Sequence, residues 1–227
     1  SALELNTTGT GNVATGYQAL YTNTTGHSNT AVGNAALYSN TTGAHGVASG
    51  YAALFSNTTG FGNVALGHVA LYNSTTGGYN IALGYAAMNA NISGYWNVAL
   101  GQEALHANTT GSNSVAIGYR AAKQTNATVV AVGSGALGSN TTGTSNTAVG
   151  TGGPLGGNTT GAHNAAFGHA TLYANTTGTR NTASGFEALK GNTTANDNTA
   201  TGYYSLFVNT TGASNVAMGS QALKANT

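Results

Sequence analysis

Apolar and polar positions recur along this chain in units of 17 residues. Each unit carries two short apolar segments, N-V-A-x-G and x-A-L-x-x, which are separated by the polar sequence N-T-T-G. The glycine that ends the first segment recurs in steps of 17 residues, with one step of 15 and one of 18. These glycines are Gly16, Gly33, Gly50, Gly67, Gly84, Gly101, Gly118, Gly133, Gly150, Gly168, Gly185, Gly202 and Gly219. The chain is therefore one array of thirteen repeats.

A unit of this length is too short for a helical hairpin, and its turn residues come too often for a long helix. It predicts one coil of a parallel β-solenoid, with two short strands per coil and coils stacked about 4.8 Å apart. We expect an all-β fold in which residues 1–227 form a single continuous β-roll, a rod about 60 Å long. Residues 2–5 resemble the end of a unit and residues 222–227 the start of another, so we expect an array that is uncapped at both ends.

Two columns of the repeat predict the interior of the coil. An Ala stands two places before every repeated glycine, from Ala14 to Ala217. Because this column accepts only the methyl side chain of Ala, it predicts a thin coil interior in which opposing walls nearly touch. The second segment supplies a column of Leu from Leu20 to Leu223, with Met88 and Ala122 in two of the units, which we expect to fill the core.

The residues on either side of the repeated Ala should point away from it, because side chains alternate along a strand. In five successive units these neighbours are apolar: Val64, Leu66, Ile81, Leu83, Val98, Leu100, Val115, Ile117, Val130 and Val132. An exposed apolar stripe of this kind is typical of a surface that another protein surface covers. It predicts a subunit interface along a trimer axis. The alternative is a wider coil in which both faces of the strand are internal.

The amino-acid composition argues against several classes of function. Charged residues make up 4% of the chain, compared with about 25% in ordinary soluble domains, and the net charge is +1. Such a chain has no basic field for nucleic acid. It contains no cysteine, so there is no disulfide scaffold, and no apolar run approaches the roughly 20 residues of a membrane helix. We therefore expect neither a nucleic-acid partner nor a membrane span.

Catalytic groups are scarce and scattered. Glu103 and Glu187 share a column five coils apart, about 24 Å at solenoid spacing. This distance far exceeds the roughly 5–10 Å between the carboxylates of a glycosidase. The six histidines are scattered over several columns and coils, whereas a metal site needs converging ligands. We expect no enzymatic activity, no catalytic residues, no metal and no cofactor.

The sequence Asn-x-Ser/Thr is the acceptor for N-linked sugars, and every unit contains one. The motifs at Asn73, Asn91 and Asn126 differ from N-T-T in sequence or in position, but each is still an acceptor. This favours one sugar per coil, whereas the alternative is that N-T-T-G is simply a good turn. The predicted glycosylation sites are Asn6, Asn23, Asn40, Asn57, Asn73, Asn91, Asn108, Asn126, Asn140, Asn158, Asn175, Asn192 and Asn209.

A second Asn column, from Asn12 to Asn215, is never followed by the hydroxyl residue that an acceptor requires. We expect it to form a structural ladder of amides, hydrogen-bonded from coil to coil.

Two units carry a resemblance to a known family. The sequences S-V-A-I-G at residues 114–118 and V-V-A-V-G at residues 129–133 resemble repeats in the head domains of trimeric autotransporter adhesins. Similar Gly-Asn-Thr-Ala arrays occur in phage and viral fibre proteins. The resemblance implies a left-handed parallel β-roll that forms a lateral trimer.

Together these features predict an extracellular structural fibre or filament subunit, at a cell or virion surface. It would be N-glycosylated and would self-associate as a lateral trimer, as a head-to-tail filament, or both. One alternative is a carbohydrate-binding adhesin or phage tail-fibre segment that uses the Tyr and His columns, such as Tyr17, Tyr51 and Tyr85. A further alternative is an ice-binding solenoid that uses the stacked Thr column.

Overall fold

The computed structural model describes residues 1–226 and is all-β. The strands are β1 (Val13–Thr15), β2 (Thr30–Val32), β3 (Val47–Ser49), β4 (Val64–Leu66), β5 (Ile81–Leu83), β6 (Val98–Leu100), β7 (Val115–Ile117), β8 (Val129–Val132), β9 (Asn146–Val149), β10 (Ala165–Phe167), β11 (Thr182–Ser184), β12 (Thr199–Thr201) and β13 (Val216–Met218). The chain divides into two compact units, Ser1–Ser114 with β1–β6 and Val115–Thr227 with β7–β13.

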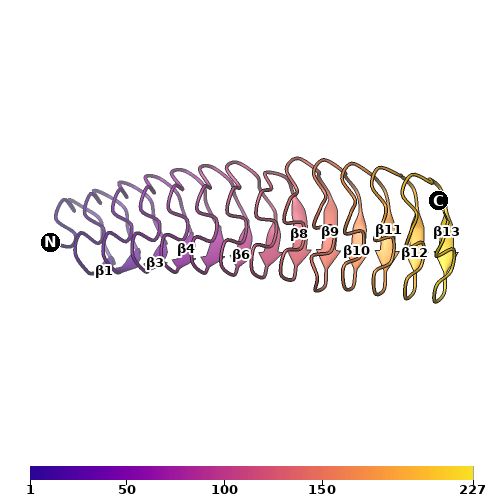
Figure 1. Cartoon of the computed structure of the whole chain (residues 1–227). Coiled ribbons are helices and arrows are strands. Elements are labelled where there is room, and N and C mark those ends of the chain that lie inside the picture. The colour runs from indigo at the N-terminus through magenta and orange to yellow at the C-terminus, as the bar shows by residue number, and fades with distance from the viewer. Residues whose placement is uncertain (227) are drawn as a thin grey trace. The chain divides into compact units, whose positions relative to one another are not determined.

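Within each unit, every strand pairs in parallel with the next strand along the chain, one coil further on (Figure 1). The register places the repeated alanines opposite one another, since Ala14 pairs with Ala31 and Ala31 with Ala48. The 15-residue and 18-residue steps of the second unit preserve this register, because Ala116 pairs with Ala131 and Ala148 with Ala166. The predicted parallel β-solenoid is confirmed.

Each coil holds one strand, so the prediction of two strands per coil was wrong. The x-A-L-x-x segment cannot be extended because alternate residues adopt left-handed backbone conformations, with φ of 55° at Gln18 and 50° at Leu20. It still bonds to the next coil, because Leu20 N–H donates to the Ala36 carbonyl over 3.0 Å. The segment therefore forms a wall of stacked turns.

The core lies between the Ala column of the strands and the Leu column of these turns. Ala31, Ala48, Leu37 and Leu54 are all fully buried. The residues beside the repeated Ala, such as Val64 and Leu66, are half-buried or exposed. The thin interior and the Leu core are thus confirmed, and the alternative of a wide coil with two internal strand faces is excluded for the described residues.

The repeated glycine after each strand is required by its backbone and by its neighbour. Gly67 has φ of 137°, a conformation that side chains rarely adopt. A Cβ atom there would lie 2.6 Å from the carbonyl oxygen of Gly84 on the next coil. This column therefore lets adjacent coils approach closely.

Candidate functional site

The Asn of N-T-T-G forms an amide ladder inside the coil, which we call the turn ladder. Asn40 Nδ2 donates to Asn23 Oδ1 over 2.7 Å and to the Gly43 carbonyl over 2.9 Å. Asn57 Nδ2 in turn donates to Asn40 Oδ1 over 2.7 Å. The same pattern continues in the second unit, where Asn158 Nδ2 donates to Asn140 Oδ1 over 2.7 Å. Both hydrogens of such an amide are used within the fold.

Ten of the thirteen predicted glycosylation sites lie in this ladder and are at most 2% exposed. An N-linked sugar replaces one hydrogen of Nδ2 and needs open space beside the nitrogen. In the ladder both Nδ2 hydrogens are used in hydrogen bonds, and the side chain is buried. One sugar per coil is therefore not compatible with the folded structure. The ten are Asn23, Asn40, Asn57, Asn91, Asn108, Asn140, Asn158, Asn175, Asn192 and Asn209.

The remaining three sites differ. Asn6 is half-buried at the first rung, where its Nδ2 donates to the Gly9 carbonyl over 3.0 Å. Asn73 and Asn126 are exposed. In these two units a hydroxyl residue takes the ladder position instead: Asn91 Nδ2 lies 3.4 Å from the Ser74 hydroxyl, and Asn140 Nδ2 lies 2.9 Å from that of Thr125.

A glycosylating host should therefore modify the folded chain selectively. When the protein is secreted from a eukaryotic cell, we expect N-linked sugar at Asn73 and Asn126 and none at the ten buried ladder positions. Enzymatic release of sugars in heavy-oxygen water, followed by peptide mapping, reads each site separately. The double variant Asn73→Gln with Asn126→Gln should lose the mass of two N-linked sugars relative to the wild type. Sugar on a buried ladder Asn of the folded protein would contradict this expectation.

The second Asn column also forms the predicted ladder, which we call the strand ladder. Asn80 N–H donates to Asn63 Oδ1 over 3.0 Å, and Asn97 N–H donates to Asn80 Oδ1 over 3.0 Å. The Nδ2 groups also donate to the carbonyl of the last residue of a neighbouring turn, as in the 2.8 Å bond from Asn80 Nδ2 to the Gly94 carbonyl. The amide ladder is confirmed.

The two threonines of N-T-T-G have different environments. The first donates its hydroxyl to a backbone carbonyl of the next coil, as in the 2.9 Å bond from Thr24 Oγ1 to the Thr41 carbonyl. The second is exposed, as at Thr25, Thr42 and Thr59. The turn thus presents a single row of outward Thr side chains. The hydroxyls of the two threonines are therefore not equivalent, and ice binding stays an expectation.

The outer face of the parallel sheet is uncovered within each unit; its outward residues are apolar in β4–β8 and polar in β11 and β12. In the first unit Val13 is 54% exposed, Val47 37% and Ile81 39%. In the second unit Ile117 and Val130 are each 37% exposed. The predicted interface residues therefore point outward as expected, while the association itself stays a prediction.

Aromatic side chains form stacks along the solenoid wall. Tyr21, Tyr38, Phe55 and Tyr72 follow one another with ring centroids 5.0–5.4 Å apart and nearly parallel planes. A second stack runs through Tyr51, His68 and Tyr85 beside the apolar sheet face. These rings brace successive coils and also offer apolar faces to the surroundings.

Charged groups are few, and several of them form pairs, such as Lys190 Nζ and Glu187 Oε1 at 2.9 Å. Arg180 makes a two-pronged contact with Asp197 on the next coil, over 2.6 Å and 2.8 Å. This hydrogen bonding lowers the pKa of the Asp197 carboxyl. Among residues 1–226 no three His, Asp or Glu side chains come together as a metal site. The described part of the chain also contains no helix long and apolar enough to cross a membrane.

Comparisons with protein-family models, with curated proteins and with solved structures find no match to this chain. The fold itself defines the class, a parallel β-solenoid with a spacing of 17 residues between most successive strands. The resemblance to adhesin heads and viral fibres, and the left-handed coil that it implies, stay expectations.

Proposed function

We propose that this chain is a structural, non-enzymatic fibre module of an extracellular or virion surface, built to associate laterally with further copies of itself. A stack of similar coils spans distance without needing a large globular core. The amide ladders support this role, because they tie each coil to the next through side chains as well as backbone. The Arg180–Asp197 contact adds a similar link on the surface.

The apolar outer face of the sheet carries the proposal. Parallel sheets are ordinarily covered on both faces, whereas here only the Ala side is covered. The uncovered face repeats from coil to coil, so a second copy can match it rung by rung. Charges are almost absent from this face, since the outward strand positions hold Val, Leu, Ile, Phe, Met, Ala, Thr and Ser. A lateral trimer buries three such faces together.

Replacing the apolar side chains of this face should dissociate the assembly. We expect the triple variant Leu66→Thr, Ile81→Thr and Leu83→Thr to raise the dissociation constant at least about 100-fold, because three half-exposed apolar side chains lose about 1 kcal/mol each. The fold should survive, since Thr199 and Thr201 occupy the same outward positions in β12. Sedimentation velocity across a range of protein concentrations measures the change.

A matched control is Ile92→Thr, because Ile92 is 46% exposed in a turn away from the sheet face. It should leave the association unchanged. A wild-type chain that stays monomeric at high concentration, or a triple variant that associates as well as the wild type, would refute the proposal.

A further inference from the structure

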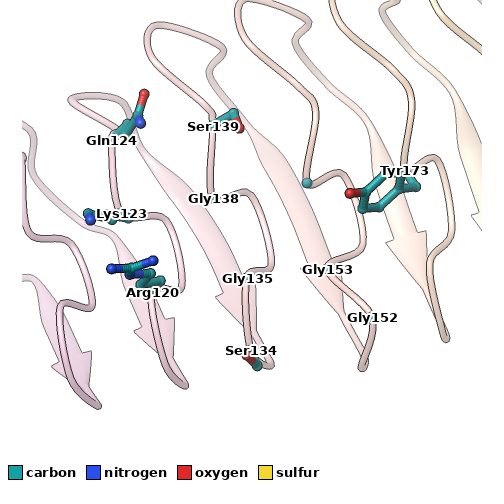
Figure 2. A pocket seen from close by; sticks show the side chains of 11 residues that line it. Arg120, Lys123, Gln124, Ser134, Gly135, Gly138, Ser139, Gly152, Gly153 and Tyr173 are labelled. Carbon is teal, nitrogen blue, oxygen red and sulfur yellow. The ribbon is translucent and has the colours of Figure 1, made fainter.

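The wall of the second unit contains a hollow of about 560 Å³, within the range typical of small-molecule sites. We call it the glycine hollow, because glycines form much of its floor. It lies on the turn segment that follows the strands, where Arg120 and Lys123 stand at one end and Tyr173 at the other (Figure 2). All of its lining residues belong to the second unit.

The hollow exists because two side chains are missing from a column of the repeat. In the first unit this column holds the continuous stack Tyr21, Tyr38, Phe55 and Tyr72. In the second unit the same column reads Lys123, Gly138, Gly156 and Tyr173. Two coils thus lack the ring that would fill the wall. The gap is open. The coils of Lys123 and Tyr173, which bound it, are three coil steps apart, about 14 Å.

The ends of the gap are chemically different. Tyr173 is 48% exposed, and its ring lies over Gly156, where a Cβ atom would be 3.3 Å from Cε2. Its hydroxyl extends toward the glycine coils (Figure 2). At the other end, the Arg120 guanidinium lies 4.9 Å from the Tyr119 ring centroid, a cation–π contact that helps to hold it in place. None of the lining residues is acidic.

We propose that the glycine hollow binds an acidic saccharide. A sugar ring takes the place of a missing aromatic ring, with its apolar C–H face against Tyr173. Its carboxylate or sulfate group faces Arg120 and Lys123, which supply charge-assisted hydrogen bonds. The hydroxyls of Ser134 and Ser139, the Gln124 amide and the exposed glycine backbone offer partners for the remaining sugar hydroxyls.

Nucleic acid fits this hollow less well. A base could stack on Tyr173, but a strand needs a basic track for its successive phosphates. The lining holds two cations, and the net charge of the whole chain is +1. A short saccharide with a single acid group near one end matches this distribution better.

Calorimetric titration of the full chain with a trisaccharide of two galactose residues and one terminal galacturonate tests the proposal. We expect binding that weakens about tenfold in Tyr173→Ala and about tenfold in Lys123→Gln. Gly138→Tyr should abolish binding, because it restores the ring that the column has elsewhere, as at Tyr38. Gly138 has no left-handed φ, and its added Cβ would lie 3.1 Å from the Gly135 carbonyl oxygen, so a small adjustment accommodates it.

The control is Lys224→Gln, which removes one positive charge from the same column outside the hollow and should change affinity less than twofold. A sulfated trisaccharide distinguishes the two acid groups, and binding of either acidic sugar supports the proposal. Equal affinity for neutral galactotriose, preference for oligothymidylate, or no binding of either acidic sugar would overturn it. Gly138→Tyr should leave self-association intact, so failure here is distinguishable from failure of the lateral-assembly proposal.

Discussion

Asn40→Ala is expected to lower the free energy of unfolding by about 2–4 kcal/mol, although the change removes only a small polar side chain. Asn40 Nδ2 donates over 2.7 Å to Asn23 Oδ1, and Asn40 Oδ1 accepts over 2.7 Å from Asn57 Nδ2. Removing the amide breaks the ladder on both sides and leaves Asn23 Oδ1 buried without its donor. The Gly43 carbonyl is affected less, because it also accepts from Asn29 Nδ2 over 2.8 Å. Urea unfolding followed by circular dichroism measures the loss.

The chain offers both a control and a reciprocal test. Asn73→Ala removes an exposed Asn just outside the ladder and should change stability by less than about 0.5 kcal/mol. Ser74→Asn restores the missing rung, and it gives a donor to Asn57 Oδ1, which is buried without a partner. We expect it to raise stability by about 1–2 kcal/mol. If Asn40→Ala behaves like Asn73→Ala, the ladder does not hold the coils together.

These asparagines also show where sequence reasoning succeeded and where it failed. The strand ladder could be predicted because its Asn column lacks any competing motif. In the turn ladder the same residues also form a sugar acceptor, and a local motif does not reveal whether its Asn is buried. The signal that could have found the ladder is register: in the units of Asn73 and Asn126, Ser74 and Thr125 occupy the Asn column. The shift moves Asn out of the ladder and onto the surface.

The columns of the core were easier to predict than the backbone between them. A constant Ala and a nearly constant Leu at fixed spacing determine which positions face inward, and both columns proved to be buried except at the ends, where Ala14 is half-buried and Leu223 is 50% exposed. The conformation of x-A-L-x-x did not follow from composition, because Gln and Leu rarely adopt positive φ. Coil-to-coil hydrogen bonds override this local preference, as at Leu20. The glycine hollow was missed for a similar reason, since it depends on two absent side chains in one column.

Replacing the repeated glycine after a strand is the other change that we expect to lower stability strongly. Gly67→Val is expected to cost more than about 3 kcal/mol, because a residue in this backbone region carries about 1–3 kcal/mol of strain before any clash is counted. The new Cβ would also lie 2.6 Å from the Gly84 carbonyl oxygen, so β4 and β5 would have to separate locally. Loss of the pairing between these strands breaks the stack in the middle of the first unit. Thermal unfolding and hydrogen exchange of the amides in β4 and β5 measure the effect.

The variant Gly11→Ser is a control, because it replaces a glycine of positive φ without bringing a Cβ atom close to the next coil. Gly11 also has positive φ, 66°, but a Cβ there would have its nearest contact at 3.6 Å. The next coil holds Ser28 at the same position, with φ of 57°. We therefore expect Gly11→Ser to cost only about 1–2 kcal/mol, a penalty limited to the left-handed backbone. Comparable losses in both variants would mean that backbone strain alone, and not the contact between coils, requires glycine after each strand.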